Sequence, residues 1–212
     1  MRQTAISFKS KELALEGVVA TPEGLPSPFP VAVLCHPHPL FGGNMDNTVV
    51  MAIARTLDAS GIASLRFNFR GVGASEGSSS KGPEEQQDLL AALKLVKQLT
   101  HLDAKRLALV GYSFGAQVIL HGLDKYKGAR AIALLSPPPS SFNGSRVAMH
   151  RKPKLFLVGD ADRLAQADRL QEQVATLHPP AQLQVIPGAD HSWHGHEEEA
   201  AQRVAQFLGA HD

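Results

Sequence analysis

Ser113 lies at the centre of the segment Gly-Tyr-Ser-Phe-Gly at 111–115, whose composition and spacing indicate chemistry. The run Arg-Leu-Ala-Leu-Val at 106–110 before it, apolar after its first residue, predicts a buried strand, and the small and apolar residues after it predict a helix. A Gly-x-Ser-x-Gly segment between a strand and a helix is typical of a nucleophile elbow, a tight turn that exposes a serine hydroxyl at the sheet edge. The glycines fit this role because side chains there would collide with the neighbouring strand and helix. We therefore predict that Ser113 is a nucleophile rather than a serine in an ordinary turn.

A serine nucleophile needs two partners, because its hydroxyl reacts poorly at neutral pH without a general base and a carboxylate that orients the base. In the sequence that follows an elbow of this kind, the acid comes first and the histidine second, each after a later strand. Asp162 follows the strand predicted at 155–158, and His191 follows the strand predicted at 182–186. All three residues are expected at the carboxyl edge of a parallel sheet, where catalytic groups gather. We predict His191 as the base and Asp162 as the orienting acid.

Each partner has a rival in the same loop. Asp160 directly abuts its strand, whereas two further residues of loop give Asp162 a longer reach. His194 and His196 lie closer to the last predicted helix, where a histidine is more often solvated. The His-Pro-His and His-Gly-His segments could also be read as metal ligands, but zinc needs three or four convergent ligands and neither segment is followed by an Asp-His pair. We expect neither a metal nor a cofactor.

Acyl transfer also needs two backbone N–H donors that stabilise the oxyanion. One donor is predicted at Phe114, the residue after the nucleophile. The other should come from the loop after the first parallel strand, His-Pro-His-Pro-Leu-Phe-Gly-Gly at 36–43. Its two prolines have no N–H, which leaves His38 or Leu40. We choose His38 by its position in the loop.

The remaining segments predict the scaffold that positions these residues. Short apolar or alternating runs predict strands at 4–8, 13–20, 31–35, 62–67, 106–110, 129–135, 155–158 and 182–186. Apolar positions at helical spacing predict helices at 47–60, from Pro83 to about residue 99, and at 115–123, 164–177 and 197–208. Because strands and helices alternate from residue 31 onward, the chain is expected to form an α/β fold with a mostly parallel sheet and helices on both faces.

The segment Asn-Phe-Arg-Gly-Val-Gly-Ala-Ser-Glu-Gly at 68–77 could be mistaken for a dinucleotide-binding fingerprint. Glu76 stands where that fingerprint needs its third glycine, and the residues that follow are loop-like. We interpret these glycines as residues of tight turns.

Composition narrows the functional class. The 212 residues are 43% hydrophobic, enough for one domain over 1–212 with its own core. The 21 Lys and Arg residues balance 20 Asp and Glu residues, so the net charge provides no strong electrostatic attraction for nucleic acid or an anionic membrane. Cys35 alone can form no internal disulfide, and neither a signal peptide nor a membrane-spanning run is visible. We expect a cytoplasmic protein that acts on a small molecule.

The chain resembles the α/β-hydrolase superfamily, and in particular small bacterial serine hydrolases of esterase type, in the segments 36–43, 68–77, 111–115, 159–162 and 188–191. The resemblance extends from about residue 15 to the end. It implies an eight-stranded sheet, a catalytic triad of Ser113, Asp162 and His191, and an oxyanion hole built by the loop at 36–43. Pro37 departs from the His-Gly that is usual at that turn.

Superfamily members with a lid usually insert it between the strand predicted here at 129–135 and the strand before the acid. Only residues 136–154 fill that gap, which is too short for a helical cap domain and predicts an open site. Four aromatic side chains could form its walls or equally belong to the core or surface: Phe41, Tyr112, Phe142 and Trp193. We predict a hydrolase of carboxylic esters, with thioesters as a variant. The alternative is a non-catalytic ligand-binding or interaction protein of the same fold.

Overall fold

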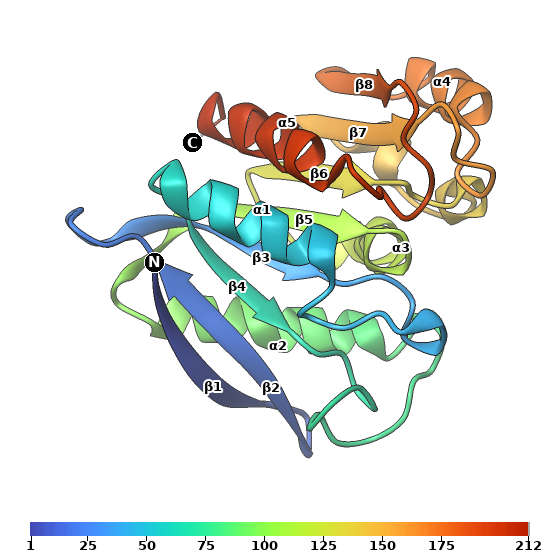
Figure 1. Cartoon of the computed structure of the whole chain (residues 1–212). Helices are drawn as coiled ribbons and strands as arrows, with labels where there is room; N and C mark the ends of the chain where they lie inside the picture. The colour runs from blue at the N-terminus through green and yellow to red at the C-terminus, as the bar shows by residue number, and fades with distance from the viewer. Residues whose placement is uncertain (212) are drawn as a thin grey trace.

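The computed structural model describes residues 1–211, which form one eight-stranded sheet covered by five α-helices (Figure 1). The strands are β1 (Arg2–Ser10), β2 (Leu13–Thr21), β3 (Phe29–Cys35), β4 (Ala63–Phe67), β5 (Leu102–Tyr112), β6 (Ala131–Leu135), β7 (Lys154–Gly159) and β8 (Ala181–Ile186). The helices are α1 (Thr48–Ala59), α2 (Glu85–Gln98), α3 (Phe114–Gly122), α4 (Ala167–Ala175) and α5 (Glu197–Gly209).

Across the sheet the strands follow the order β1-β2-β4-β3-β5-β6-β7-β8. The pairs β1–β2 and β2–β4 are antiparallel, and every other neighbouring pair is parallel. The carboxyl ends of β3 to β8 therefore meet at one edge of the sheet. The mostly parallel α/β fold expected from the sequence is confirmed.

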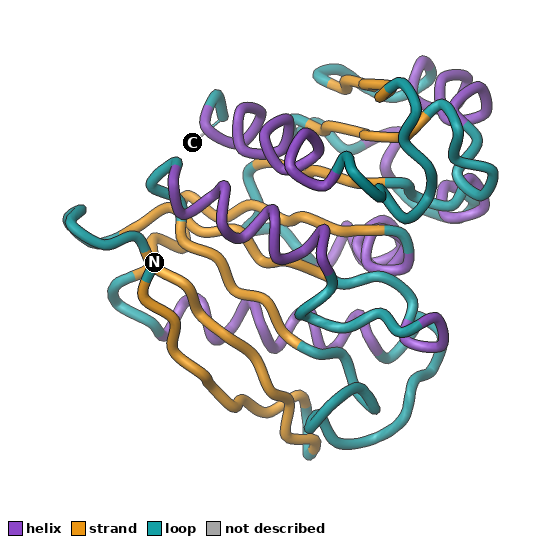
Figure 2. Tube along the Cα trace, in the orientation of Figure 1, coloured by secondary structure: helices purple, strands orange, loops and turns teal. Residues whose placement is uncertain are grey.

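Alternate residues of β3 show why helices cover both faces of the sheet. Ala32 and Leu34 belong to the apolar cluster that contains residues of α1 and α5, whereas Val31, Val33 and Cys35 belong to the cluster that contains residues of α2 and α3. Figure 2 shows α1 and α5 in front of the strands and α2 and α3 behind them. A strand that is buried on both faces is uniformly apolar, as this one is.

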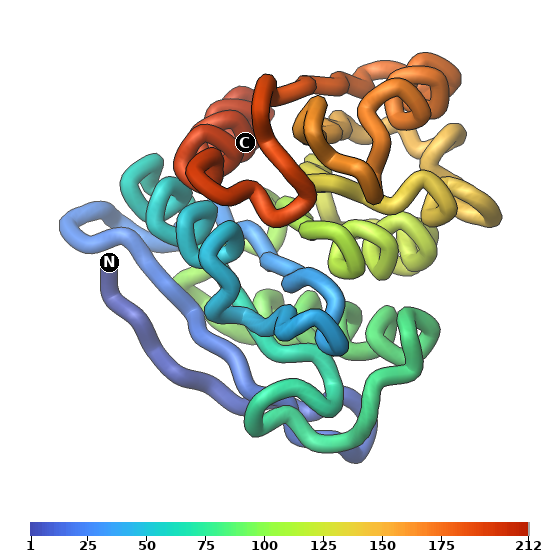
Figure 3. Tube along the Cα trace, turned by 45° about the vertical axis from the view of Figure 1, so that its right-hand side comes forward, coloured from blue at the N-terminus to red at the C-terminus, as the bar shows by residue number. Residues whose placement is uncertain are grey.

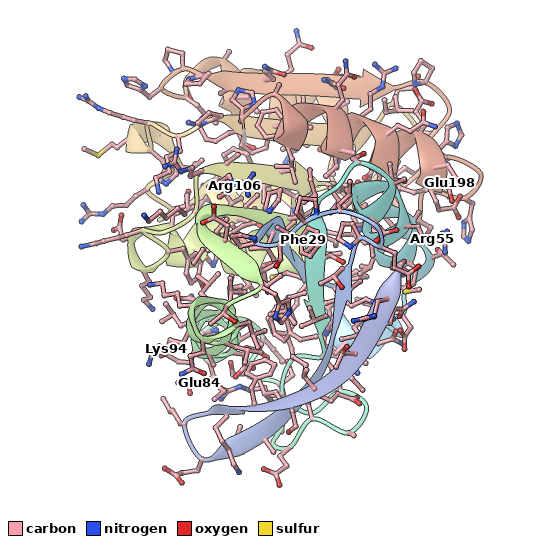
Figure 4. The ribbon with its side chains drawn as sticks, turned by 90° about the vertical axis from the view of Figure 1, so that its left-hand side faces the viewer. Phe29, Arg55, Glu84, Lys94, Arg106 and Glu198 are labelled. Carbon is pink, nitrogen blue, oxygen red and sulfur yellow. The ribbon has the colours of Figure 1, made fainter. Side chains whose placement is uncertain are left out.

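An exposed ion pair links the two helices in front of the sheet. Arg55 of α1 donates to Glu198 of α5 with an N–O distance of 3.0 Å, and Figure 4 shows the two labelled side chains next to one another. Both side chains are more than half exposed, so their pairing contributes little to stability. The apolar contacts beneath them determine how the helices pack.

The loop at 68–77 contains tight turns rather than a nucleotide-binding helix start, as predicted from its sequence. Three of its glycines have positive φ: Gly71, Gly73 and Gly77. Arg70 anchors the loop through hydrogen bonds from its guanidinium to the buried carboxylate of Asp88 on α2, at 2.6 and 3.0 Å. Ser10 at the end of β1 donates to the same carboxylate. This buried network ties the antiparallel hairpin, the loop and α2 together.

The structure differs from the predicted boundaries where side chains bind the backbone. The helix predicted to begin at residue 164 begins at Ala167, because Asp162 accepts hydrogen bonds from the N–H groups of Leu164 and Ala165 and holds them in a turn. Between β6 and β7 lie only two short 3-10 helices, Pro139–Phe142 and Val147–Met149, so the expected absence of a cap domain is confirmed. No helix in the described residues has both the length and the apolar character needed to cross a membrane.

Candidate active site

Ser113 occupies a sharp turn between the last residue of β5 and the first residue of α3. Its φ of 52° and ψ of −108° are strained for a residue with a side chain. A Cβ atom at Gly115 would lie 2.2 Å from the carbonyl oxygen of Cys35, and one at Gly111 would lie 2.7 Å from the backbone N of Ala116. The two glycines therefore allow helix α3 to begin directly against β3 and β5, which presents the serine at the sheet edge.

The structure brings together the serine, the histidine and the aspartate predicted from the sequence. Ser113 Oγ lies 2.9 Å from His191 Nε2, and His191 Nδ1 lies 2.9 Å from Asp162 Oδ2. Because Nδ1 must donate to the carboxylate, Nε2 is the acceptor for the serine hydroxyl. The loops after β5, β7 and β8 that carry these residues lie beside one another in Figure 3, which turns this edge forward. The arrangement allows the imidazole to accept a proton from the serine.

The rival residues lie outside this hydrogen-bonded chain. Asp160 accepts the N–H of Gly188 at 2.7 Å and so braces the loop after β8. His194 is 81% exposed at its side chain and stands 3.8 Å from Asp190. His196 precedes α5, where its Nδ1 contacts the carbonyl oxygen of His194. Within residues 1–211, no group of three or more His, Cys, Asp and Glu side chains is arranged to hold a metal ion.

Asp162 is fully buried at its side chain and remains an effective acceptor. Burial by itself raises the pKa of this carboxyl, but hydrogen bonds from His191, from the Ala165 amide and from the Ser136 hydroxyl outweigh it and hold the pKa below its ordinary value. A carboxylate that stays ionised keeps the imidazole in the orientation and tautomer that a general base needs.

Three further residues support this arrangement, and the sequence did not predict a supporting role for any of them. The indole of Trp193 is fully buried and donates to Ser136 Oγ at 3.1 Å, and both residues have positive φ. Tyr112 donates its hydroxyl to the carbonyl oxygen of His191 at 2.6 Å. The aromatic character of Trp193 and Tyr112 was a signal in the sequence, whereas Ser136 had none.

The loop after β3 carries the second expected oxyanion donor. The N–H of Leu40 donates to His38 Nδ1 at 3.2 Å and is therefore engaged, whereas no protein acceptor is found for the N–H of His38 or of Phe114 in residues 1–211. His36 anchors the loop: its Nδ1 donates to the carbonyl oxygen of Pro37 at 2.7 Å, and its Nε2 accepts the N–H of Phe69. Burial lowers the pKa of His36 to about 4, so its ring is neutral at pH 7.

An open cleft of about 640 Å³ lies over Ser113. Its walls include Pro37, His38, Phe41, Gln117, Pro138 and Leu164. Of the four aromatic residues named from the sequence, Phe41 and Tyr112 line the cleft. Phe142 instead stacks on Phe156 with a ring-centroid distance of 5.5 Å, and Trp193 is buried in the core.

Comparison with known proteins places this chain in a family. Residues 32–209 match the family model described as an alpha/beta hydrolase domain. An uncharacterized protein of Rickettsia prowazekii, RP471, is 32% identical over 96% of this chain and 87% of its own length. The crystal structure of XC6422 from Xanthomonas campestris, an α/β serine hydrolase without a lid, is 30% identical with a TM-score of 0.88 over 99% of this chain and 95% of that one.

An α/β serine hydrolase homologue from Coxiella burnetii is likewise 30% identical, with a TM-score of 0.87 over 98% of each chain. The three matches cover 87%, 95% and 98% of the relatives' own lengths. The chain belongs to the alpha/beta hydrolase family.

Proposed function

We propose that this protein is a serine hydrolase that cleaves carboxylic esters through an acyl-enzyme on Ser113. The observation that carries the proposal is the chain of two hydrogen bonds, each 2.9 Å long, from Ser113 through His191 to Asp162. Similarity to an α/β serine hydrolase without a lid and to an α/β serine hydrolase homologue supports the same reaction class. No other group of side chains described above combines a nucleophile, a base and an orienting acid.

In the first half of the reaction, His191 Nε2 accepts the proton of the Ser113 hydroxyl while the serine oxygen attacks the ester carbonyl carbon. The tetrahedral intermediate then collapses, the bond from carbon to the alcohol oxygen breaks, and the imidazolium returns its proton to the departing alcohol. In the second half, the same histidine takes a proton from water, whose oxygen attacks the acyl-enzyme and releases the carboxylic acid. Asp162 stabilises the imidazolium in both halves and stays ionised.

The oxyanion of each tetrahedral intermediate needs donors that are free before substrate binds. The N–H of Phe114 belongs to the first turn of α3, where helical N–H groups have no partner within the helix. The N–H of His38 is the other donor, since that of Leu40 is engaged with the His38 side chain. Both residues line the cleft over the serine.

The test is hydrolysis of p-nitrophenyl acetate and labelling by a fluorophosphonate probe, with wild type compared with Ser113→Ala. We expect wild type to be labelled, and the variant to lose labelling and about a thousandfold or more of the rate. Ser192→Ala, which alters another serine of the same cleft, is the matched control and should still be labelled. Full activity in Ser113→Ala would refute the mechanism. If folded wild type resisted the probe and hydrolysed no ester, a non-catalytic ligand-binding protein would be favoured instead. A parallel assay with a thioester substrate decides between an esterase and a thioesterase.

A further inference from the structure

We infer that the cleft selects neutral esters with an apolar acyl chain that covers Phe41 and Leu164, and that it discriminates against acyl chains that carry an ionised group. The inference deepens the proposed function and rests on it for the chemical step. It starts from two exposed apolar side chains that line the cleft and that we call its rim: the exposed fraction is 88% for Phe41 and 67% for Leu164. Large apolar side chains exposed together beside a cleft are typical of a binding surface.

Phe41 is held firmly although its ring faces solvent. Its N–H donates to the carbonyl oxygen of His38 at 3.0 Å within a 3-10 turn that ends at Gly42, whose φ is 78°. The ring centroid of Phe41 lies 5.4 Å from that of His38, which in turn lies 4.9 Å from that of Phe114. Phe41 is exposed and Phe114 is fully buried, and the half-buried ring of His38 contacts both. An acyl chain attached to the reacting carbonyl can therefore lie against His38 and Phe41.

Leu164 also lines the cleft, and its position is set by the acid of the proposed triad. The N–H of Leu164 donates to Asp162 Oδ1 at 2.9 Å, so the same carboxylate that orients His191 also fixes the turn that presents the leucine. Pro138, from the short connection between β6 and β7, lines the cleft as well. A substrate chain between Phe41 and Leu164 would remove both side chains from water, which is favourable in proportion to the apolar area covered.

Within residues 1–211, the side chains that line the cleft include none that carries a permanent charge. Among the described residues that line it there is no Lys, Arg, Asp or Glu; its polar side chains belong to Ser, Thr, Tyr, Asn, Gln and His. Asp162 lies behind His191 with its side chain fully buried. A carboxylate or phosphate carried into the cleft would lose hydration without gaining an ion pair with a Lys or Arg side chain, which is unfavourable. The same reasoning disfavours thioesters whose phosphate groups must enter the cleft.

The first test compares kcat/KM for p-nitrophenyl acetate, butyrate and hexanoate, together with a pair that differs in charge, p-nitrophenyl pentanoate and p-nitrophenyl hemisuccinate. We expect kcat/KM to rise with acyl length, by up to about fourfold for each methylene that becomes buried. The hemisuccinate should react at least about tenfold more slowly than the pentanoate. Equal rates for the charged and neutral esters, or no rise with length, would overturn the inference.

The second test assigns the preference to the rim. Phe41→Ala and Leu164→Ala should each reduce kcat/KM for the hexanoate by about tenfold, with a smaller loss for the acetate. Leu25→Ala is the matched control, because Leu25 is 53% exposed but does not line this cleft. An equal loss for all three esters, or no loss in either rim variant, would contradict the role of the rim.

The failure of this inference is distinguishable from the failure of the proposed function. Hydrolysis that depends on Ser113 but ignores acyl length and charge would refute the inference alone. The cleft can also be tested without the chemical step, by calorimetric titration of intact p-nitrophenyl hexanoate into Ser113→Ala protein. If the double variant with Ser113→Ala and Phe41→Ala binds the ester more weakly than Ser113→Ala alone, the inference is supported. Unchanged binding would overturn it, whatever the outcome for catalysis.

Discussion

Replacement of Ser136 by alanine should affect stability and catalysis separately, because its hydroxyl has two partners. It accepts the indole N–H of Trp193 at 3.1 Å and donates to the carboxylate of Asp162. The serine and the tryptophan are both fully buried. In Ser136→Ala the indole N–H has no acceptor, and a buried donor without a partner costs about 1–3 kcal/mol. We expect the free energy of unfolding to fall by that amount.

The catalytic consequence follows from the second partner. Loss of one hydrogen bond moves the pKa of Asp162 toward its ordinary value and lets the carboxylate shift, although the amides of Leu164 and Ala165 still hold it. A hydrogen bond to a charged group contributes about 1.5–3 kcal/mol, and only part of that should appear in the rate. We expect kcat for p-nitrophenyl acetate to fall about tenfold, with little change in KM because Ser136 does not line the cleft.

A double-mutant cycle with Trp193→Phe separates the two effects. Phenylalanine removes the indole N–H, so Ser136→Ala in that background leaves no unpartnered donor there, and its additional destabilisation should be clearly smaller than in wild type. The reduction in kcat should remain in the double variant, because Asp162 still lacks the hydrogen bond from the Ser136 hydroxyl. Urea unfolding measures the stability, and steady-state kinetics measures kcat. Additive destabilisation, or recovery of kcat in the double variant, would refute the reasoning.

Two further predictions concern the backbone of the elbow and the neutral histidine of the first loop. Gly115→Ala should lower the free energy of unfolding by about 3 kcal/mol or more, because the added Cβ would lie 2.2 Å from the Cys35 carbonyl oxygen. Gly209→Ala is the control and should be tolerated, because a Cβ there meets no atom within 4 Å. Equal urea midpoints for the two variants would contradict the steric account. The pKa of His36 is lowered from 6.5 to about 4, so the unfolded chain binds the extra proton first and the folded state loses about 3 kcal/mol as the pH falls from 6.5 to 4. The free energy of unfolding of His36→Asn should decline less over that interval and run parallel to that of wild type above it. Urea unfolding at several pH values measures this dependence. If the free energy of unfolding changed equally with pH in both proteins, the histidine would not be responsible.

The sequence by itself determined the fold class and the identity of the candidate site residues. Alternation of apolar strands and amphipathic helices is a local pattern, and it predicted the parallel sheet with helices on both faces. The spacing of glycines around Ser113 predicted the turn, and the positions of Asp162 and His191 after later strands placed them at the same edge. Element ends were predicted less accurately: the start of α4 depends on hydrogen bonds to Asp162, which a hydrophobic pattern does not reveal.

Only the tertiary structure decided which neighbours support those residues. Trp193 and Ser136 are separated by 57 positions in the chain, and nothing in either local sequence indicates that they form a buried hydrogen bond. The choice between His38 and Leu40 likewise depends on the conformation of the loop, in which the leucine N–H is already engaged. Periodicity and motif spacing report which face a residue occupies and which strand it follows. Hydrogen-bond partners depend instead on distances of a few ångströms between distant segments, and those distances are determined only when the sheet and both helical layers pack together.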